Sequence, residues 1–420
     1  MRLPALLKLS ARSVGRNVRR SALTAAAMAL GLALLIFSRG LAEGGHEQWI
    51  DSAVRLGTGH VAIQAPNHLE TNRLEHHLNE EQTDRVVAAL ADPDVEDLIL
   101  RWTPRLAVTG LASSAASALP VRIEGVDPDM EPSFSELGDY LSEGRYLEEG
   151  DRLQAYVGVE FARRLELNVG SRFVLTAQGA TGDVESQLMR VAGTFRTGVK
   201  EMDESFIHVP IETVREWLQA PGAVTTLAVL LPTSRATDPT VEALGAVLEG
   251  EAGIRVMGWR QASPDLDSAV RIDDYGDYVF HVILFAIVAL AILNAVMMSV
   301  LGRRREFGIL QAIGLTGPET GLVVFGEGLF LTAASGVVGI VLGAIVTWGY
   351  FGDGIDFSAM IEGEMDIGGG VIDPVIVPAF HFDTILLSLF FIVIIGTISS
   401  LYPAFRASKL DVAEAMKFEQ

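Results

Sequence analysis

Two residue types are scarce in this sequence, and each shortage excludes a class of site. The 420-residue chain has no cysteine, which excludes disulfides, thiolate metal sites and a cysteine nucleophile. A P-loop that hydrolyses nucleotides needs Gly-Lys-Ser/Thr, because its lysine reaches the β and γ phosphates. The only four lysines are followed by Leu, Glu, Leu and Phe: Lys8, Lys200, Lys409 and Lys417. We therefore expect this chain to bind no cofactor, and any ATP use to come from another chain.

Other catalytic and metal patterns are incomplete. His46-Glu47 begins like a zinc protease motif, but Ile50 stands where the second histidine is required. No Gly-x-Ser-x-Gly is present, which excludes the nucleophile elbow of the α/β-hydrolases. Four further histidines have spacings that fit no standard metal site and suggest a solvated surface: His60, His68, His76 and His77. We expect no catalytic residue and no metal ligand, and hence no enzyme.

Negative charge is concentrated in one part of the chain. The net charge of −21 comes from 53 acidic and 32 basic residues. Between Glu43 and Asp277 there are 40 acidic and 19 basic residues, a difference of −21, so the rest of the chain is neutral overall. Because so acidic a surface repels a phosphate backbone, we expect no nucleic-acid partner.

Four apolar stretches are long enough to cross a bilayer, which needs about 20 helical residues. The third contains a single acidic residue, Glu327. We predict four transmembrane helices, at 21–43, 279–302, 321–351 and 384–405.

The flanking charges orient these helices, because Lys and Arg concentrate on the cytoplasmic side of a membrane. Residues 1–20 carry six basic and no acidic residues, and the connection after the second helix opens with Arg303-Arg304-Arg305. Residues 352–383, in contrast, have seven acids and no base. We therefore predict that both termini are cytoplasmic and that the first helix is an uncleaved signal-anchor.

The remaining segments follow from this topology. Residues 1–20 have basic and apolar faces typical of an amphipathic helix on the lipid of the inner leaflet, although a disordered basic leader would also fit. We expect a cytoplasmic coupling helix or loop at 303–320, an extracytoplasmic loop at 352–383 and a cytoplasmic tail at 406–420.

The segment 44–278 mixes two periodicities. Alternating or β-branched runs predict strands at 60–64, 119–126, 172–176, 188–195 and 226–231. Helices are predicted at 79–91, with Asn79 as N-cap, and at 237–248, with Thr237 or Asp238 as N-cap. The fold class is therefore a membrane protein of four transmembrane α-helices, with a large α+β extracytoplasmic domain of two lobes inserted between helices 1 and 2.

The strongest local motif runs from Arg303 to Thr316, with the sequence RRREFGILQAIGLT. It resembles the segment between the second and third transmembrane helices in the MacB, LolC/LolE and FtsX group of ABC transporter permeases. The match runs through Glu306, Gly308, Leu310, Ala312, Ile313 and Gly314.

The end of the chain carries a second match to the same group. Tyr402-Pro403-Ala404 and the residues up to Glu414-Ala415 look like the group's closing motif, with Val412 where proline is usual. Motif similarity covers about the last 140 residues and the first 60. Leu56-Gly57-Thr58-Gly59-His60-Val61 and Glu201-Met202-Asp203 favour the lipoprotein-releasing branch of the group.

This resemblance implies a MacB-like periplasmic domain and a short helix that docks on the ATPase. The implied ATPase-coupling residues are Arg303, Arg304, Arg305, Glu306, Phe307, Gly308, Leu310, Ala312 and Gly314. The implied partners are a cytoplasmic ABC ATPase in two copies, which binds ATP and magnesium, and a second permease, identical or homologous. A hydrophobic substrate, such as a lipoprotein, is implied as well, with or without a periplasmic carrier.

Three functions remain open for a chain of this kind in the bacterial inner membrane. The first is mechanotransmission that releases lipoproteins or other hydrophobic substrates on the periplasmic side. The second is MacB-like efflux of an amphiphilic drug or peptide. The third is FtsX-like regulation of a cell-wall hydrolase without transport, although FtsX-type exterior domains are usually smaller.

Two features of the third transmembrane helix also leave alternatives. Ser335, Gly339 and Gly343 form a small-residue stripe that permits tight packing, against a helix of the same chain or of a second permease. Glu327 lies near the cytoplasmic end, where an intramembrane carboxylate takes part in substrate or proton chemistry, reaches the interface or pairs with a basic loop residue.

Overall fold

A computed structural model describes residues 18–357, 366–367, 370–371, 375–379 and 382–410. The chain divides into two compact units. The helical unit comprises Met1–Gly45, Asp273–Asp356 and Val375–Gln420, and the α+β unit comprises His46–Ile272 and Phe357–Pro374. The predicted helix at 1–20 lies outside the described residues except for its last three. Parts of the 352–383 loop and the end of the 406–420 tail also lie outside them.

The helical unit is built from long apolar helices. It holds α13 (Arg304–Ala312), α14 (Gly317–Ala344) with the π-helical turn η3 (Ile345–Tyr350), and α15 (Phe382–Ser408). It also holds α2 (Val18–Leu56) up to Gly45 and α12 (Pro264–Leu301) from Asp273, while the remaining residues of these two helices belong to the α+β unit. In the part of the chain that the structure describes, four helices are long and apolar enough to cross a membrane: Met28–Leu56, Pro264–Leu301, Gly317–Tyr350 and Ile385–Ser408. They carry the four apolar stretches of the sequence.

Helix α2 continues beyond the apolar stretch that the sequence marks. It passes without a break through Gly44 and Gly45 and ends at Leu56. The backbone of Val377 lies so close to Gly44 that a side chain there would collide with it, and the N–H of Ala379 donates to Gly40 O at 2.9 Å. The glycine pair therefore admits a neighbouring segment of the helical unit and does not end the helix.

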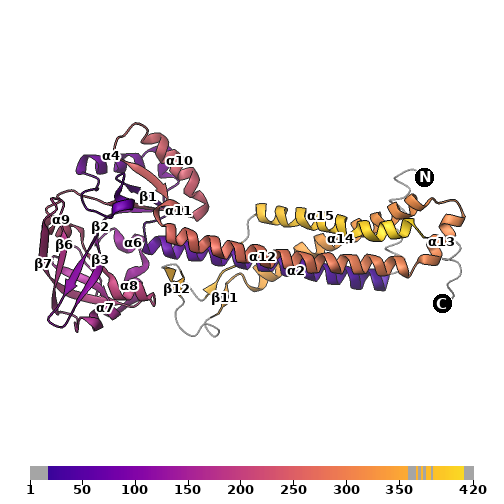
Figure 1. Cartoon of the computed structure of the whole chain (residues 1–420), viewed down its shortest axis with the longest axis horizontal. Coiled ribbons are helices and arrows are strands. Elements are labelled where there is room, and N and C mark those ends of the chain that lie inside the picture. Colours follow the sequence, from indigo (N-terminus) through magenta and orange to yellow (C-terminus); the bar gives the residue numbers. More distant parts are fainter. Residues whose placement is uncertain (1–17, 358–365, 368–369, 372–374, 380–381, 411–420) are drawn as a thin grey trace. The chain divides into compact units, whose positions relative to one another are not determined.

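Two residues of the small-residue stripe of α14, Gly339 and Gly343, lie against α2 of the same chain. A Cβ at Gly339 would lie 2.7 Å from the Cβ of Leu32, and one at Gly343 would lie 3.0 Å from the Cβ of Ile36. Ser335 on the same stripe is buried. Figure 1 shows α14 and α15 side by side, and Gly328 and Gly396 admit side chains between those two helices.

One ten-stranded sheet forms the centre of the α+β unit, in the order β10-β1-β9-β2-β3-β8-β5-β7-β4, with β6 paired to β2 and β7. Its strands are antiparallel except in the pairs β3–β8 and β5–β7. The strands are β1 (Val61–Gln64), β2 (Arg101–Ser113), β3 (Ala118–Val126), β4 (Leu141–Gly144), β5 (Gln154–Gly158), β6 (Arg172–Gln178), β7 (Val184–Phe195), β8 (Phe206–Pro210), β9 (Thr226–Leu230) and β10 (Arg255–Gly258). The five predicted strands are confirmed.

Short helices cover this sheet. They are α3 (His68–Thr71), α4 (Glu80–Leu90), α5 (Pro93–Glu96), α6 (Glu131–Phe134), η1 (Glu136–Tyr140), α7 (Val159–Arg164), α8 (Lys200–Ser205), α9 (Ile211–Trp217), η2 (Ser234–Ala236), α10 (Thr237–Val247) and α11 (Trp259–Ala262). Two-stranded pairs join β11 (Ile355–Asp356) to β14 (Val375–Ile376) and β12 (Asp366–Ile367) to β13 (Gly370–Val371).

The two predicted helices of the α+β unit are confirmed, but only one of their caps is. Asn79 caps α4 in a capping box, in which its side chain accepts from the N–H of Gln82 at 2.9 Å. Helix α10 has Ala236 at its N-cap and no side-chain cap, so the prediction of Thr237 or Asp238 as cap is wrong. The chain enters α10 from the 3₁₀ turn η2, which already occupies the position where a cap would act.

The predicted division into two lobes is seen only in the side-chain packing. One apolar cluster lies between the strands β2, β3 and β5–β8 and the helices α7 and α9. A second lies between β1, β9 and the helices α4, α5 and α10. Both clusters share one continuous sheet, because β9 pairs with β2.

The interpretation of the histidines as a solvated surface is wrong for two of the four. His60 and His68 are buried, and His60 Nδ1 accepts the N–H of Leu231 at 3.2 Å. Burial lowers the pKa of His60 from 6.5 to about 4, and the nearby Asp51 opposes this only in part. No group of three or more His, Asp or Glu side chains that could hold a metal ion occurs among the described residues.

Acidification is expected to destabilise the α+β unit through His60. Between its folded pKa of about 4 and the ordinary 6.5, the unfolded chain binds more protons, so stability present above pH 6.5 is lost as the pH falls. We expect a loss of up to about 3 kcal/mol between pH 7 and pH 4. The measurement is urea unfolding of the purified chain, followed by tryptophan fluorescence.

The control is His60→Asn, whose amide oxygen can still accept from Leu231. Its unfolding free energy should change less with pH than that of the wild type. Burial also lowers the pKa of His68 and His208, so a shallower slope remains in the variant. Equal slopes in the two proteins would contradict the assignment to His60.

The packing of α14 on α2 predicts a second stability effect. Gly339→Ala adds a methyl group where the Cβ of Leu32 cannot rotate away, and overpacking of this kind costs about 1–3 kcal/mol. Gly336→Ala, on the same helix, is the matched control, because a Cβ there meets nothing within 4 Å. We expect the first variant to lower the melting temperature in detergent and the second to leave it unchanged or raise it. Similar melting temperatures would show that the contact tolerates a methyl group.

Candidate functional site

The segment that joins α12 to α14 is the helix α13. Phe307 and Gly308 on this helix are buried. Phe307 belongs to an apolar cluster with Val300 of α12, Val324 of α14 and Ala404 of α15. One face of α13 is thus fixed to three long helices of the helical unit.

Arg303, directly before α13, adds an ionic attachment. Its Nη1 donates to Oε1 of Glu327 at 2.7 Å and its Nε donates to Oε2 of Glu306 at 2.9 Å. The guanidinium also lies 5.0 Å from the centre of the Phe307 ring. Of the alternatives for Glu327, the structure shows the pair with a basic loop residue.

The opposite face of α13 is open. Arg305, Ile309, Ala312 and Ile313 are exposed, Ile309 by 43% and Ile313 by 79%. Their spacing of i, i+4, i+7 and i+8 places them on one side of the helix. Sequence reasoning assigned no coupling role to Ile309 or Ile313, although their positions four and eight residues after Arg305 were a usable signal.

The predicted coupling residues therefore divide between the two faces of α13 and its ends. Arg303, Glu306, Phe307, Gly308 and Leu310 are buried or half-buried toward the helical unit, Arg304 is half-buried, and Arg305 and Ala312 are exposed.

Gly314 ends this segment. Its φ of +116° lies in the region that favours glycine, and the N–H of Leu315 donates to Leu310 O at 3.0 Å. A Cβ at Gly314 would meet nothing within 4 Å, so backbone conformation, and not close approach, explains this glycine within the chain. Helix α14 then begins in a capping box between Thr316 and Glu319.

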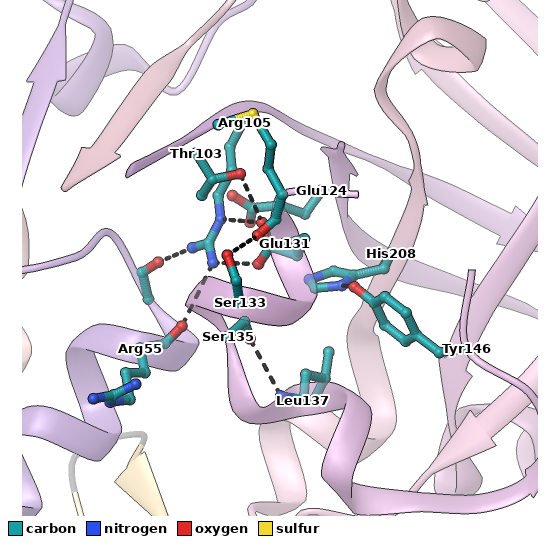
Figure 2. Close-up of polar contacts among 12 residues, drawn as sticks. Arg55, Thr103, Arg105, Glu124, Glu131, Ser133, Ser135, Leu137, Tyr146 and His208 are labelled. Atoms are coloured by element: carbon teal, nitrogen blue, oxygen red, sulfur yellow. Dashed lines mark hydrogen bonds and ion pairs between the residues drawn. The ribbon is translucent and has the colours of Figure 1, made fainter. Parts of the chain in front are cut away.

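A buried polar cluster lies in the α+β unit (Figure 2). Arg105 on β2 is 2% exposed and Glu131 on α6 is 0% exposed. Their side chains pair through Nη2 and Oε1 at 2.5 Å and through Nε and Oε2 at 3.2 Å. Thr103 also donates to Glu131 Oε2 at 3.2 Å. Burial raises the pKa of the Glu131 carboxyl, and the Arg105 guanidinium opposes that shift.

The same guanidinium reaches the end of α2. Arg105 Nη1 donates to the carbonyl of Gly57, and Nη2 lies 3.5 Å from the carbonyl of Arg55. The last carbonyls of a helix have no partner within it, so Arg105 satisfies them from the sheet. Figure 2 shows the Arg105 guanidinium between Glu131 and the carbonyl of Arg55.

Two neutral side chains complete the cluster. Tyr146 Oη and Nδ1 of His208 share a hydrogen bond at 2.9 Å. Burial raises the pKa of Tyr146 well above its ordinary value, and burial, aided by Arg105, lowers that of His208. The acidic and basic groups are thus paired, and the cluster has the character of a structural connection.

The Glu201-Met202-Asp203 motif has a local structural role. Asp203 is buried, and its carboxylate accepts from the N–H and the hydroxyl of Thr197, both at 2.9 Å, and from Gly198 N–H at 3.2 Å. The motif closes the loop between β7 and β8.

Two family models match the chain. The model described as MacB-like periplasmic core domain matches residues 21–247, and the model described as FtsX-like permease C-terminal matches residues 278–412. The second match includes α13 and its open face.

Individual relatives agree with these models. The lipoprotein-releasing system transmembrane protein LolC of Neisseria meningitidis serogroup B is 25% identical, over 76% of this chain and 79% of that protein. LolE of Haemophilus influenzae is 22% identical, over 94% of this chain and 93% of that protein. The macrolide export ATP-binding/permease protein MacB of Chlorobium luteolum is 30% identical over 30% of this chain, but over only 16% of that protein.

The match of residues 21–247 covers more than half of the 420-residue chain. The chain therefore belongs to the MacB, LolC/LolE and FtsX group of ABC transporter permeases, with a MacB-like periplasmic core domain and an FtsX-like membrane region.

Proposed function

We propose that this chain is the permease subunit of an ATP-driven complex that releases lipoproteins, or other hydrophobic substrates, from the bacterial inner membrane on the periplasmic side. Two copies of a cytoplasmic ABC ATPase bind ATP and magnesium, and a second permease, identical or homologous, completes the complex. The names of the LolC and LolE relatives, which align over most of the chain, support the lipoprotein substrate.

The proposed topology places four transmembrane helices in the membrane at 21–43, 279–302, 321–351 and 384–405. The α+β domain at 44–278 and the loop at 352–383 lie on the periplasmic side, and both ends of the chain are cytoplasmic. The basic residues at 1–20 and 303–305, set against the absence of Lys and Arg from the 352–383 sequence, support this orientation.

The observation that carries the proposal is the open face of α13. An exposed pair of isoleucines beside an arginine is suited to a partner that supplies an apolar pocket with an acidic rim. The buried Arg303–Glu327 pair and Phe307 attach α13 to α14 and to the helices on either side. When the ATPase closes on ATP, a push on α13 therefore moves α12, α14 and α15 together.

The open face predicts the residues that bind the ATPase. Ile313→Asp places a carboxylate where an apolar side chain is expected to enter the partner. We expect the affinity for the ATPase to fall about thirtyfold, the loss typical of a side chain that contributes about 2 kcal/mol to an interface. The measurement is co-purification and ATPase stimulation with the ATPase that accompanies the wild-type chain.

Val184→Asp is the matched control, since Val184 is 71% exposed on β7 of the α+β unit. It should leave ATPase binding unchanged. Wild-type affinity in Ile313→Asp would remove α13 from the interface.

The substrate is tested with the purified complex in lipid nanodiscs that contain a labelled lipoprotein. We expect ATP to release the lipoprotein to a soluble acceptor at least tenfold faster than a non-hydrolysable analogue does. An ATP-dependent export of an amphiphilic drug or peptide without lipoprotein release would favour the MacB-like alternative. Stable co-purification of a cell-wall hydrolase, with neither activity, would favour the FtsX-like alternative.

A further inference from the structure

We infer that the buried Arg105–Glu131 pair is the joint that fastens helix α2 to the sheet of the α+β unit and so transmits movement of this helix to the sheet. The inference rests on the proposed function, in which ATP-driven movement of the transmembrane helices has to reach the exterior domain. Arg105 and Glu131 act as positioning residues and contact no substrate in this scheme.

Arg105 is fixed at the centre of the sheet. Its strand β2 lies between β3 and β9, where Arg105 pairs with Val126 on one side and with Thr226 on the other. Its carbonyl accepts from both the N–H and the hydroxyl of Thr225, at 2.9 and 3.1 Å. The guanidinium that reaches α2 therefore extends from a backbone that is hydrogen-bonded to a strand on each side.

The connection from α2 to the sheet is short and has little freedom. Gly59 has a φ of +81°, and its N–H donates to Val54 O in the last turn of α2 at 2.9 Å. A side chain at Gly59 would collide with the backbone of Val229, because a Cβ there would lie 2.6 Å from its carbonyl oxygen. Strand β1 starts two residues later, so no flexible linker separates the helix from the sheet.

Apolar packing surrounds the joint. Trp49, Ile50 and Val54 of α2 belong to a buried cluster with Phe134 of α6 and Leu230 of β9. The Arg105 guanidinium lies 4.9 Å from the centre of the Phe134 ring. The residues that follow α2 include the Gly57 carbonyl that Arg105 binds, in the motif that resembles the lipoprotein-releasing branch.

Apolar contacts have no preferred direction, whereas the hydrogen bonds of Arg105 fix the position of α2 relative to the sheet. Its N–H groups are divided between Glu131 and the carbonyls of Gly57 and Arg55, so α2, α6 and β2 meet at one side chain. A displacement of α2 would break the hydrogen bonds from Arg105 to the carbonyls of Gly57 and Arg55, which favours movement of the sheet with the helix.

The test compares release with ATP hydrolysis in the double variant Arg105→Met/Glu131→Leu. Replacing both members avoids a stranded buried charge and keeps an apolar volume, so the unit is expected to fold. We expect the ATPase rate to stay within twofold of wild type, while lipoprotein released per ATP falls at least tenfold. Arg145→Met/Asp151→Leu is the matched control, because that pair also forms two hydrogen bonds, at 2.7 and 2.8 Å, and does not contact α2.

A second readout does not depend on the substrate. Because the chain has no cysteine, spin labels can be placed at Val184→Cys in the α+β unit and Tyr350→Cys in the helical unit, which are 71% and 81% exposed. We expect ATP to shift the distance distribution in the wild-type background and in the matched control, but not in the joint variant. A melting temperature measured on each protein confirms that the variants are folded.

Rescue separates a joint from a general structural role. The hydroxyl oxygens of Thr58 and Ser263 lie 3.4 Å apart, so Thr58→Cys/Ser263→Cys offers a disulfide that attaches the end of α2 to the turn before α12. In the joint variant, this disulfide should restore both the release and the distance shift, and a reductant should abolish them again.

The outcomes are distinct. A joint variant that releases substrate and shifts its distance like the wild type overturns the inference, as does a failure of the disulfide to restore either property. If the wild-type complex shows the ATP-dependent shift but releases no lipoprotein, the proposed substrate is wrong, and the distance measurements still decide the role of the joint.

Discussion

A buried ion pair inside the α+β unit holds the last turn of α2 to the central sheet. Removing two charges from water is costly, and such a pair persists only where its geometry and remaining hydrogen bonds are satisfied. Arg105 meets this condition with Glu131 on one side and the last carbonyls of α2 on the other. Helix α6 takes part in that arrangement because it supplies Glu131, and the chain at the end of α2 takes part because it supplies the carbonyls of Gly57 and Arg55.

The helical unit uses the same chemistry for a different purpose. Arg303 pairs with the buried Glu327 and so holds the start of α13 against α14. In both units an arginine on one element is paired with a glutamate on another. Each guanidinium donates several hydrogen bonds in fixed directions, so it orients the two elements as well as attracting them. The two arginine sites differ in how much of their surroundings is exposed. The joint around Arg105 is enclosed, whereas α13 keeps an exposed face with Ile309 and Ile313.

Features encoded locally could be predicted from the sequence. Residues a few positions apart determine the apolar stretches, the capping box at Asn79 and strands such as β7, so these patterns can be recognised in the sequence. The burial of His60 could not be predicted from the sequence, because its hydrogen-bond partner Leu231, at the end of β9, is 171 residues away. The Arg105–Glu131 pair, 26 residues apart among many acids and arginines, was equally hidden. The exposed face of α13 could be predicted only in part. The sequence shows the spacing of its residues, but it does not show which face of the helix is buried.

The sequence by itself determined the separation of charge and hydropathy, and the group of permeases to which the chain belongs. Both are sums or short motifs, which need no knowledge of contacts. Only the tertiary structure decided that Gly44 lies inside a helix, that two glycines of the α14 stripe lie against α2, and that Glu327 is paired. Those outcomes depend on which distant backbone or side chain fills the space beside each residue, and a linear pattern carries no information about that space.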